Sequence, residues 1–295
     1  MSEKNKSRRE FIKIAASVAG TIVLTGAAKK LIAATTEKPS GEVGRMHSEL
    51  QEALKKSPSQ RKWMMGVDVR KCVGCDSCSV ACAVENVAPV GTSYRTVNKV
   101  ETGEDKGINR FFMPTNCQQC DNAPCMKAAN AIVPSAVTKR EDGIVVFNYE
   151  ILKGSKEARN AAKKACPYTA IVDEDGGFYT ANTPKTEQYE NRAIFEYDGE
   201  YKNKSSLKGT IRKCTYCLHR LNSGMLPACV TTCIGRAMYF GDANDSTSLV
   251  SEKFRTKDIY VMKPENKPRV AYLGYKSKEE LPKISSESCV MCHGE

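Results

Sequence analysis

The sequence predicts an α+β protein built around groups of cysteines, and two observations lead to this prediction. Fourteen cysteines occur among 295 residues, and most of them are separated by only two or three residues. Short strand-like runs precede three of the cysteine groups, and helical stretches accompany the first and the third. Cysteines at this spacing are typical of metal-binding loops, so we expect bound metal to organise the fold.

The composition is that of a folded protein with a basic excess. Hydrophobic residues make up 41% of the chain, charged residues 27%, and the formal net charge is +11. No uninterrupted apolar run reaches roughly 18 residues, so a spanning helix in the mature protein is not expected. The basic excess permits binding to nucleic acid or to an anionic membrane, but metal-bound thiolates would place compensating negative charge inside the fold. A disordered chain, a collagen-like chain and a multi-span membrane protein are excluded.

The N-terminus resembles a twin-arginine export signal. Residues 7–13 read SRREFIK, and an apolar run follows over residues 14–28. That run is short and weakly hydrophobic for a bilayer span, and small residues at 33–34 offer a cleavage position. A cytosolic amphipathic helix with a chance arginine pair is the alternative. We expect residues 1–34 to form a signal region, residues 35–61 a polar linker, and the mature protein to be periplasmic.

The first cysteine group has the spacing of an iron–sulfur ligand set. A strand-like run at residues 63–69 is followed by Cys72, Cys75, Cys78 and Cys82, in the pattern C-x2-C-x2-C-x3-C. Two-residue gaps let three sulfurs of one loop converge on three corners of a [4Fe–4S] cubane. The fourth cysteine, at the start of a helix, serves the other cluster of a two-cluster ferredoxin. A zinc site would use two separated pairs of ligands, and disulfides suit this spacing poorly.

The pattern recurs in three altered forms. The second group follows a strand-like run at residues 110–113, and the third ends a helical stretch that follows a run at residues 143–147. The second group holds Cys117, Cys120 and Cys125, the third holds Cys166 before a proline, and the fourth holds Cys214, Cys217, Cys229 and Cys233.

This succession, over roughly residues 63–240, resembles the iron–sulfur subunits of respiratory oxidoreductases. That family includes the four-cluster subunits of dimethyl sulfoxide, polysulfide and tetrathionate reductases and the NrfC-like periplasmic subunits. The resemblance implies tandem two-cluster bacterial-ferredoxin-like folds with insertions, and electron transport in anaerobic respiration. It also implies two partners. One is a catalytic reductase subunit, with molybdopterin or as a multihaem cytochrome, and the other is an NrfD-type quinone-reactive membrane subunit.

The chain departs from the family at four cysteine positions. Where the second group usually ends in a cysteine this chain has Ala129, and three cysteines of the third group are replaced at approximately Lys156, Arg159 and Ala162. In the family's scheme, the first three cysteines of one group share a cluster with the last cysteine of its partner group. All four absent ligands then belong to one cluster, which implies that one cluster is lost and three stay complete.

The scheme assigns twelve cysteines to these three clusters. The sets are Cys72, Cys75, Cys78 and Cys233 for cluster 1; Cys214, Cys217, Cys229 and Cys82 for cluster 2; and Cys117, Cys120, Cys125 and Cys166 for cluster 3.

Two cysteines are left over, and they form a haem attachment motif. Cys289 and Cys292 precede His293 in the sequence CVMCH, in which the thiols form thioethers with haem c and the histidine binds the iron. A chance match and a zinc half-site are the alternatives. The second axial ligand stays open among His47, His219, a methionine and a side chain of a partner.

Two polar segments complete the organisation. Residues 172–213 form an insertion, either a β-hairpin that docks a partner or a solvated loop over a cluster. Residues 253–295 form a tail with a short strand at residues 268–272, which tethers the haem. The three-cluster domain is therefore expected at residues 62–252.

The motifs indicate electron transfer rather than substrate turnover. No phosphate loop, Ser/His/Asp set or general acid–base pair is recognised, so we expect no catalytic residue in this chain. Three [4Fe–4S] clusters and one haem c would relay electrons between a quinone-linked membrane partner and a terminal reductase. The haem would replace the lost relay or open a new exit, or else merely decorate the tail. The alternatives are a free-standing exported redox carrier and a zinc-stabilised nucleic-acid-binding module; the export signal disfavours the second, so no nucleic-acid partner is expected.

Overall fold

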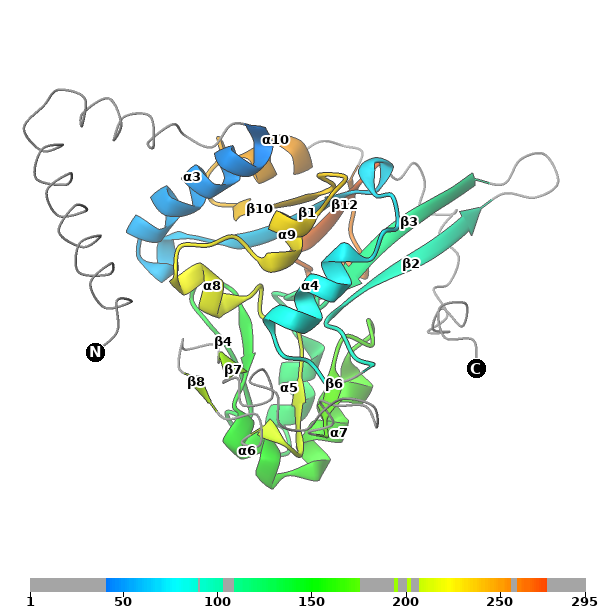
Figure 1. The fold of residues 1–295 in the computed structure, drawn as a ribbon. Helices are drawn as coiled ribbons and strands as arrows, with labels where there is room; N and C mark the ends of the chain where they lie inside the picture. Colours follow the sequence, from blue (N-terminus) through cyan, green and yellow to red (C-terminus); the bar gives the residue numbers. More distant parts are fainter. Residues whose placement is uncertain are drawn as a thin grey trace, which may run out of the picture.

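The computed structural model describes seven stretches of the chain: residues 41–89, 91–102, 109–175, 194–195, 201–202, 207–255 and 259–274. The signal region, most of the insertion and the haem motif at Cys289, Cys292 and His293 lie outside them. Among the described residues, no helix combines the length and the apolar content that a bilayer crossing requires. Two separate hydrophobic cores divide the described fold into an upper and a lower lobe in the view of Figure 1.

A four-stranded mixed sheet forms the centre of the upper lobe (Figure 1). Its order is β10-β1-β12-β11, with β1 at Trp63–Asp68, β10 at Met238–Asp242, β11 at Ile259–Tyr260 and β12 at Val270–Leu273. The central strand β1 pairs antiparallel with β10 and parallel with β12. It is buried along nearly its whole length, as expected for a strand covered on both faces. The strand predicted at residues 63–69 is therefore confirmed.

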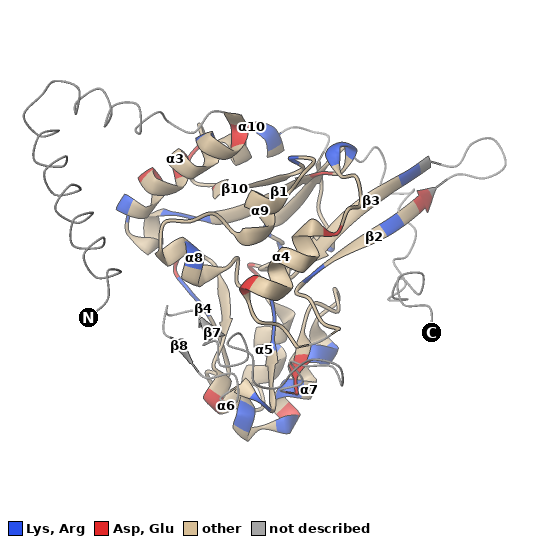
Figure 2. Cartoon of the chain, viewed as in Figure 1, with Lys and Arg blue, Asp and Glu red and all other residues tan. Residues whose placement is uncertain are grey.

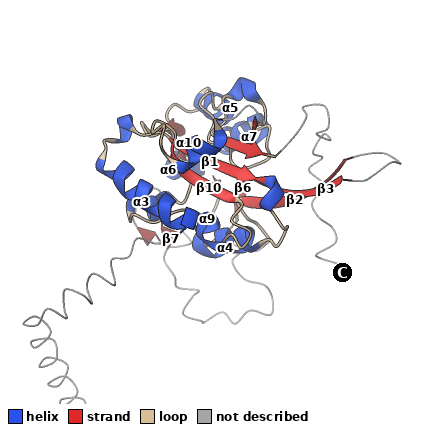
Figure 3. Ribbon diagram, turned by 90° about the horizontal axis from the view of Figure 1, so that it is seen from above, coloured by secondary structure: helices blue, strands red, loops and turns tan. Residues whose placement is uncertain are grey.

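Helices α3 (Gly41–Lys55) and α10 (Leu249–Phe254) pack side by side against β10 (Figures 1 and 3). The interpretation of residues 35–61 as a polar linker is wrong for α3. Its residues Met46, Leu50 and Ala53 are buried in the upper core, at the spacing of one helix face. The Glu49 carboxylate accepts a hydrogen bond from the backbone N–H of Leu249, and it thereby caps α10.

The upper lobe extends further along the chain than the predicted boundary at residue 252. The strand predicted at residues 268–272 exists as β12, but it lies inside the central sheet and not on a tether. Leu273, its last residue, pairs with Asp68, the last residue of β1. The segment that would carry the haem motif therefore leaves the described fold after Gly274, beside Arg70.

Three short helices and one long hairpin complete the upper lobe. The helices are α4 (Ser77–Glu85), α8 (Leu218–Asn222) and α9 (Ala228–Thr232). Helices α4 and α9 pack against each other. Strands β2 (Arg95–Thr102) and β3 (Asn109–Asn116) form an antiparallel hairpin that projects from the sheet (Figures 1 and 3). The strand predicted at residues 110–113 lies within β3.

The lower lobe has a core of small residues between helices and two-stranded ladders. Helices α5 (Pro124–Asn130), α6 (Tyr149–Gly154) and α7 (Lys156–Ala165) surround the ladders of β4 (Val137–Lys139) with β5 (Val145–Phe147) and of β6 (Val172–Glu174) with β9 (Thr210–Arg212). The predicted strand at residues 143–147 is β5, and the predicted helical stretch before Cys166 is α7. The β6–β9 ladder closes the base of the insertion, within which Ile194–Phe195 pairs with Tyr201–Lys202.

Candidate metal centres

The twelve cysteines that the structure describes gather in three groups of four, which we call cages 1 to 3. None of these cysteines forms a disulfide. Cage 1 contains Cys72, Cys75, Cys78 and Cys233; cage 2 contains Cys82, Cys214, Cys217 and Cys229; and cage 3 contains Cys117, Cys120, Cys125 and Cys166. The structure thus brings together the four members of each set that the sequence analysis assigned to one cluster.

Cage 1 lies where the chain turns from β1 into α4. Gly74 takes a positive φ of 69° in the loop, and any side chain there would overlap the Phe112 ring, so the turn requires glycine. Cys233 arrives from the end of α9, and the backbone N–H of Ala237 donates to its Sγ at 3.2 Å. Cys75 is exposed, and its hydrogen bond with the Ser77 side chain lowers the pKa of the thiol. Cage 1 is therefore the cage that reaches the surface.

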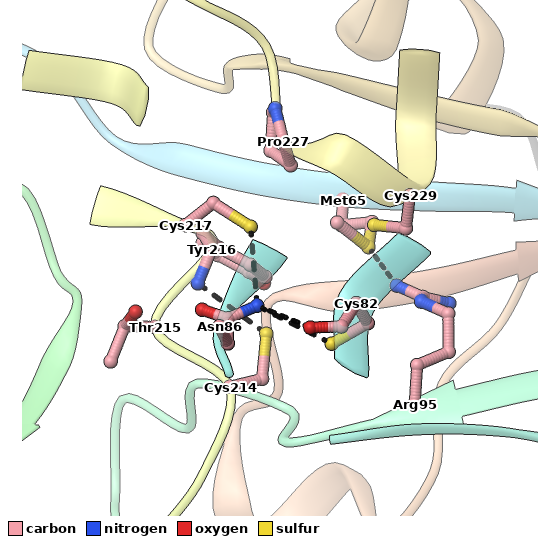
Figure 4. A pocket seen from close by; sticks show the side chains of 10 residues that line it. All are labelled: Met65, Cys82, Asn86, Arg95, Cys214, Thr215, Tyr216, Cys217, Pro227 and Cys229. Carbon is pink, nitrogen blue, oxygen red and sulfur yellow. Dashed lines mark hydrogen bonds between the residues drawn. The ribbon is translucent and has the colours of Figure 1, made fainter. Parts of the chain in front are cut away.

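The four cysteines of cage 2 line one pocket together with Met65, Asn86 and Arg95 (Figure 4). Cys82 lies one turn after Cys78 on α4, so a single helix supplies a thiol to cage 1 and a thiol to cage 2. The loop from β9 to α8 supplies Cys214 and Cys217, and both Tyr216 and Cys217 have positive φ angles there.

Two asparagine amides donate hydrogen bonds to the sulfurs of cage 2. Asn86 Nδ2 lies 3.6 Å from Cys82 Sγ and 3.9 Å from Cys217 Sγ. Asn116 Nδ2 lies 3.6 Å from Cys214 Sγ. Donors directed at sulfur stabilise a thiolate, which is the form that binds metal.

Cage 3 lies in the lower lobe, where its four cysteines line one pocket together with Tyr168. Cys117 and Cys120 follow β3, and Cys125 lies in the first turn of α5 after Pro124 at the helix start. Cys166 is the C-cap of α7, and the Tyr168 hydroxyl lies 3.7 Å from Cys120 Sγ.

Burial makes the cage thiols poor acids in the absence of metal. Desolvation raises the pKa of Cys78, Cys120 and Cys214 to about 11, and that of Cys82 and Cys125 to about 12. A free thiolate in these positions is costly, whereas a bound metal replaces the proton and neutralises the charge. The donor set, the cavities and the hydrogen bonds to sulfur fit an iron–sulfur cluster in each cage. Within the described residues, no three His, Cys, Asp or Glu side chains form a site for a single metal ion.

The cages form a row with cage 2 in the middle. Cys78 of cage 1 interacts electrostatically with Cys229 of cage 2, and Cys214 of cage 2 interacts with Cys117 of cage 3. Adjacent cages thus lie close enough for charge on one to be felt by the next.

Comparison with known proteins agrees with this arrangement. A family model described as a 4Fe–4S dicluster domain matches residues 108–190 and again residues 173–243. The chain is 43% identical to a selenate reductase subunit of Mesobacillus selenatarsenatis, over 78% of this chain and 77% of the relative. It is 34% identical to a tetrathionate reductase subunit of Salmonella typhimurium over 74% of each chain. It is 30% identical to the arsenate respiratory reductase iron–sulfur subunit ArrB of Shewanella sp., over 71% of this chain and 94% of the relative.

The chain belongs to the family of iron–sulfur subunits of respiratory reductases. The family resemblance given by the cysteine pattern is thereby confirmed, as are the ferredoxin-like dicluster architecture and the presence of [4Fe–4S] clusters.

This iron–sulfur subunit has helix packing where the sequence analysis placed four missing ligands. Ala129 of α5 and Ala162 of α7 are fully buried where the two helices pack together. Lys156 is exposed in the first turn of α7, which begins when Ser155 accepts a hydrogen bond from Ala158 N–H.

Arg159, the last of the four residues that replace the family's cysteines, caps a helix of the subunit. Its Nη1 donates to the carbonyl oxygens of Leu152 at 2.5 Å and Lys153 at 2.9 Å, at the end of α6. The guanidinium thus adds a donor to two carbonyl groups at the end of α6, of which that of Leu152 also accepts from the backbone N–H of Ser155. The residues at the four positions where the chain lacks the family's cysteines thus belong to α5 and α7, and together they support α6, α7 and the contact of α7 with α5.

The two described histidines of the subunit lie in different surroundings. His219 is buried on α8, and its Nε2 lies 2.9 Å from Glu85 Oε1. Arg220 donates to the other oxygen of Glu85 at 3.0 Å. This is the environment expected for a polar residue beside a cluster loop. His47 lies half-buried on α3.

The sequence analysis missed the polar residues that surround the cages. Asn86 lies four residues after Cys82 at the end of the same helix, and this spacing could have revealed it. Asn116 directly precedes Cys117 and Lys213 directly precedes Cys214, but nothing in the sequence shows where their side chains point. Arg95 lies outside every cysteine group, and only the fold brings it to cages 1 and 2.

Proposed function

We propose that this protein is the electron-transfer subunit of a respiratory reductase complex, between a quinone-linked membrane subunit and a catalytic subunit. The observation that carries the proposal is the row of three cysteine cages, two of which share helix α4. Its relatives are named as subunits of selenate, tetrathionate and arsenate reductases. A molybdopterin enzyme is the catalytic partner that this family implies, and a multihaem cytochrome is the alternative.

The proposed cofactors of the described fold are three [4Fe–4S] clusters, one in each cage. When bound, each cluster accepts and releases one electron. The chain's own part is to hold four thiolates at each site, to exclude water from cages 2 and 3, and to direct amide N–H groups at the sulfurs of cage 2. The fourth cluster of the family has no place in this proposal, because none of its four ligand positions holds a cysteine and two of them, Ala129 and Ala162, are packed between α5 and α7.

A partly apolar surface beside cage 1 supports a stable partner over a free-standing carrier. Four of the six exposed large hydrophobic side chains of the described residues are Val73, Val80, Val84 and Ile234. They lie on α4 or directly beside ligands of cage 1. Figure 2 shows that α4 and α9 carry almost no charge, whereas α6 and α7 carry charges of both signs. Exposed apolar side chains beside a redox centre are typical of a protein–protein interface.

We further propose that Cys289 and Cys292 bind a haem c through thioethers and that His293 ligates its iron. Fourteen residues separate Gly274 from Cys289, so the attachment point lies within about 50 Å of the end of β12. Because β12 ends beside Arg70, two residues before Cys72, the tail starts near cage 1. This favours a new electron exit at that end over replacement of a relay beyond cage 3.

A chain that ends at Lys276 tests the haem's role. This truncation keeps β12 and should retain three reducible clusters, but it should exchange electrons with the physiological partner many-fold more slowly. Undiminished exchange would show that the haem is not a relay.

We also propose that the twin-arginine motif at residues 7–13 exports the folded, cluster-loaded protein to the periplasm, where membrane association would come only through the complex.

The decisive experiment for the proposed function is purification of the exported protein through an affinity tag from cells respiring anaerobically. We expect about 13 iron atoms per chain, twelve of them in cubanes and one in haem, together with a catalytic and a membrane subunit in stoichiometric amounts. Recovery of a loaded but solitary protein, able to reduce soluble cytochromes, would instead support the free-standing carrier.

A further inference from the structure

Arg95 is a buried cation between cages 1 and 2. It is the first residue of β2 and only 2% of it is exposed. Its charged neighbours are cage cysteines: Cys78 of cage 1, and Cys82, Cys214 and Cys229 of cage 2. Figure 4 shows the guanidinium directed into the space beside Cys82 and Cys229.

The guanidinium has little compensation from the rest of the described chain. Nη2 donates to the Met65 sulfur at 2.7 Å, while Nη1 is buried without a hydrogen-bond partner. Among the described residues, no carboxylate forms an ion pair with Arg95. A buried charge without a partner of opposite sign is strongly destabilising, so the fold implies a negative group at this position.

The other buried arginines of the described chain donate to oxygen acceptors, although Nε of Arg61 and Nε of Arg212 also lack a partner. Arg212 pairs with the Glu174 carboxylate at 2.9 Å, and Arg269 pairs with Asp121. Arg61 donates to backbone carbonyl oxygens, among them that of Lys56 at 3.1 Å. Arg95 differs from all three, since the groups around it are thiols and a thioether.

We propose that Arg95 is a cofactor-tuning residue that donates a hydrogen bond from Nη1 to the sulfur of a bound cluster and raises the reduction potentials of clusters 1 and 2 together. This inference rests on the ligand sets proposed above for these two clusters. Reduction adds one negative charge to a cluster, and a nearby fixed positive charge in a low-dielectric interior favours the reduced form. Because Arg95 lies between cages 1 and 2, it lowers the free energy of reduction of the cluster in each of them.

Cage 3 serves as an internal reference. Arg95 is not among the main electrostatic neighbours of Cys120, Cys125 and Cys166; the cation there is Lys213, which acts on Cys125 and Cys166. Its amine donates to the carbonyl oxygens of Val145 at 2.5 Å and Cys214 at 3.1 Å. The potential of cluster 3 should therefore not respond to a change at Arg95.

The test is an EPR-monitored redox titration of the loaded protein with Arg95→Met and Arg95→Lys. At a fixed ambient potential, Arg95→Met should lower the ratio of reduced to oxidised cluster at least about tenfold for clusters 1 and 2, which for one electron is about 59 mV. Arg95→Lys should lower it less, because the charge is kept. Arg61→Met is the matched control, since it removes a buried arginine that no cage cysteine faces. The cluster 3 signal is identified as the one lost in Cys166→Ser.

A second measurement covers the case in which Arg95→Met fails to assemble. In wild-type protein labelled with ¹⁵N-arginine, pulsed EPR of the reduced state should detect a nitrogen hyperfine coupling that disappears in Arg95→Lys. Unshifted potentials in a fully loaded Arg95→Met protein, an equal shift of all three clusters, or a missing coupling in the wild type would each overturn the proposal. An iron content that contradicts three clusters would instead refute the proposed ligand sets.

Discussion

Replacing Ala162 by leucine is expected to release cluster 3 while clusters 1 and 2 stay in place. Ala162 is 0% exposed on α7, and Ala129 of α5 and Ala158 of α7 are equally buried. The two helices that meet here carry ligands of the same cage, since Cys125 lies on α5 and Cys166 caps α7. A larger side chain at Ala162 must therefore strain the interface or separate two ligands of cage 3.

The size of the effect of Ala162→Leu follows from the absence of space around Ala162. Inserting extra carbon atoms into a packed core costs about 1–3 kcal/mol when the structure keeps its geometry. That strain is relieved if α7 moves away from α5, which carries Cys166 away from Cys125. This strain is a large fraction of the stability of a typical domain. We therefore expect α7 to move away from α5 and the protein to lose about four iron atoms per chain.

The assay is iron and sulfide analysis of the purified protein, together with its thermal unfolding. Asn160→Leu is the matched control, because Asn160 is exposed on the same helix. Full iron content and the thermal stability of the control in Ala162→Leu would refute the reasoning. Such a result would mean that the space of a fourth cluster is still open between α5 and α7.

Three further predictions address single features of the chain. Cys166→Ser should remove one cluster and leave the EPR signals of the other two; loss of all signals would contradict the separate cages. Changing both Cys289 and Cys292 to serine should abolish covalent haem staining and preserve the cluster absorption; collapse of that absorption would make these thiols cluster ligands. Changing both Arg8 and Arg9 to lysine should strand cluster-containing, haem-free protein in the cytoplasm, as fractionation and haem staining would show; normal amounts of haem-loaded protein would exclude this export signal.

The local part of each cage could be predicted because ligand spacing is a local property, whereas the fourth ligand of each set, such as Cys233 in cage 1, came from the family's ligation scheme. In the first group, two-residue gaps let three sulfurs of one loop converge, and a helix places Cys82 one turn beyond Cys78. The same local logic identifies β1, β3 and β5 as strands. These parts of the fold need no knowledge of distant contacts.

The parts that the sequence did not reveal depend on contacts between distant segments. Helix α3 has an apolar face of Met46, Leu50 and Ala53, but its many charged residues suggested a linker, and only β10 explains its burial. Strand β12 pairs with β1 across about 200 residues of chain. Arg95 shows no motif at all, and its position between two cages follows only from the docking of the β2–β3 hairpin.

The two ends of the cage row differ, and under the proposal that a fourth cluster is absent these differences are consistent with each other. At the cage 3 end, the four positions where the family has cysteines lie in helices α5 and α7: Ala129 and Ala162 pack, Arg159 caps α6, and Lys156 is the exposed first residue of α7. Cys166 remains in place because it lies just beyond that helix, so cage 3 is complete although a cluster beyond it is not supported. At the cage 1 end, β12 ends beside Arg70, so the tail starts near an exposed thiol and a surface of valine and isoleucine. If the haem is bound and the fourth cluster is absent as proposed, electrons gain an exit at the end opposite to the missing relay, and the direction along the row is set by potentials to which Arg95 contributes.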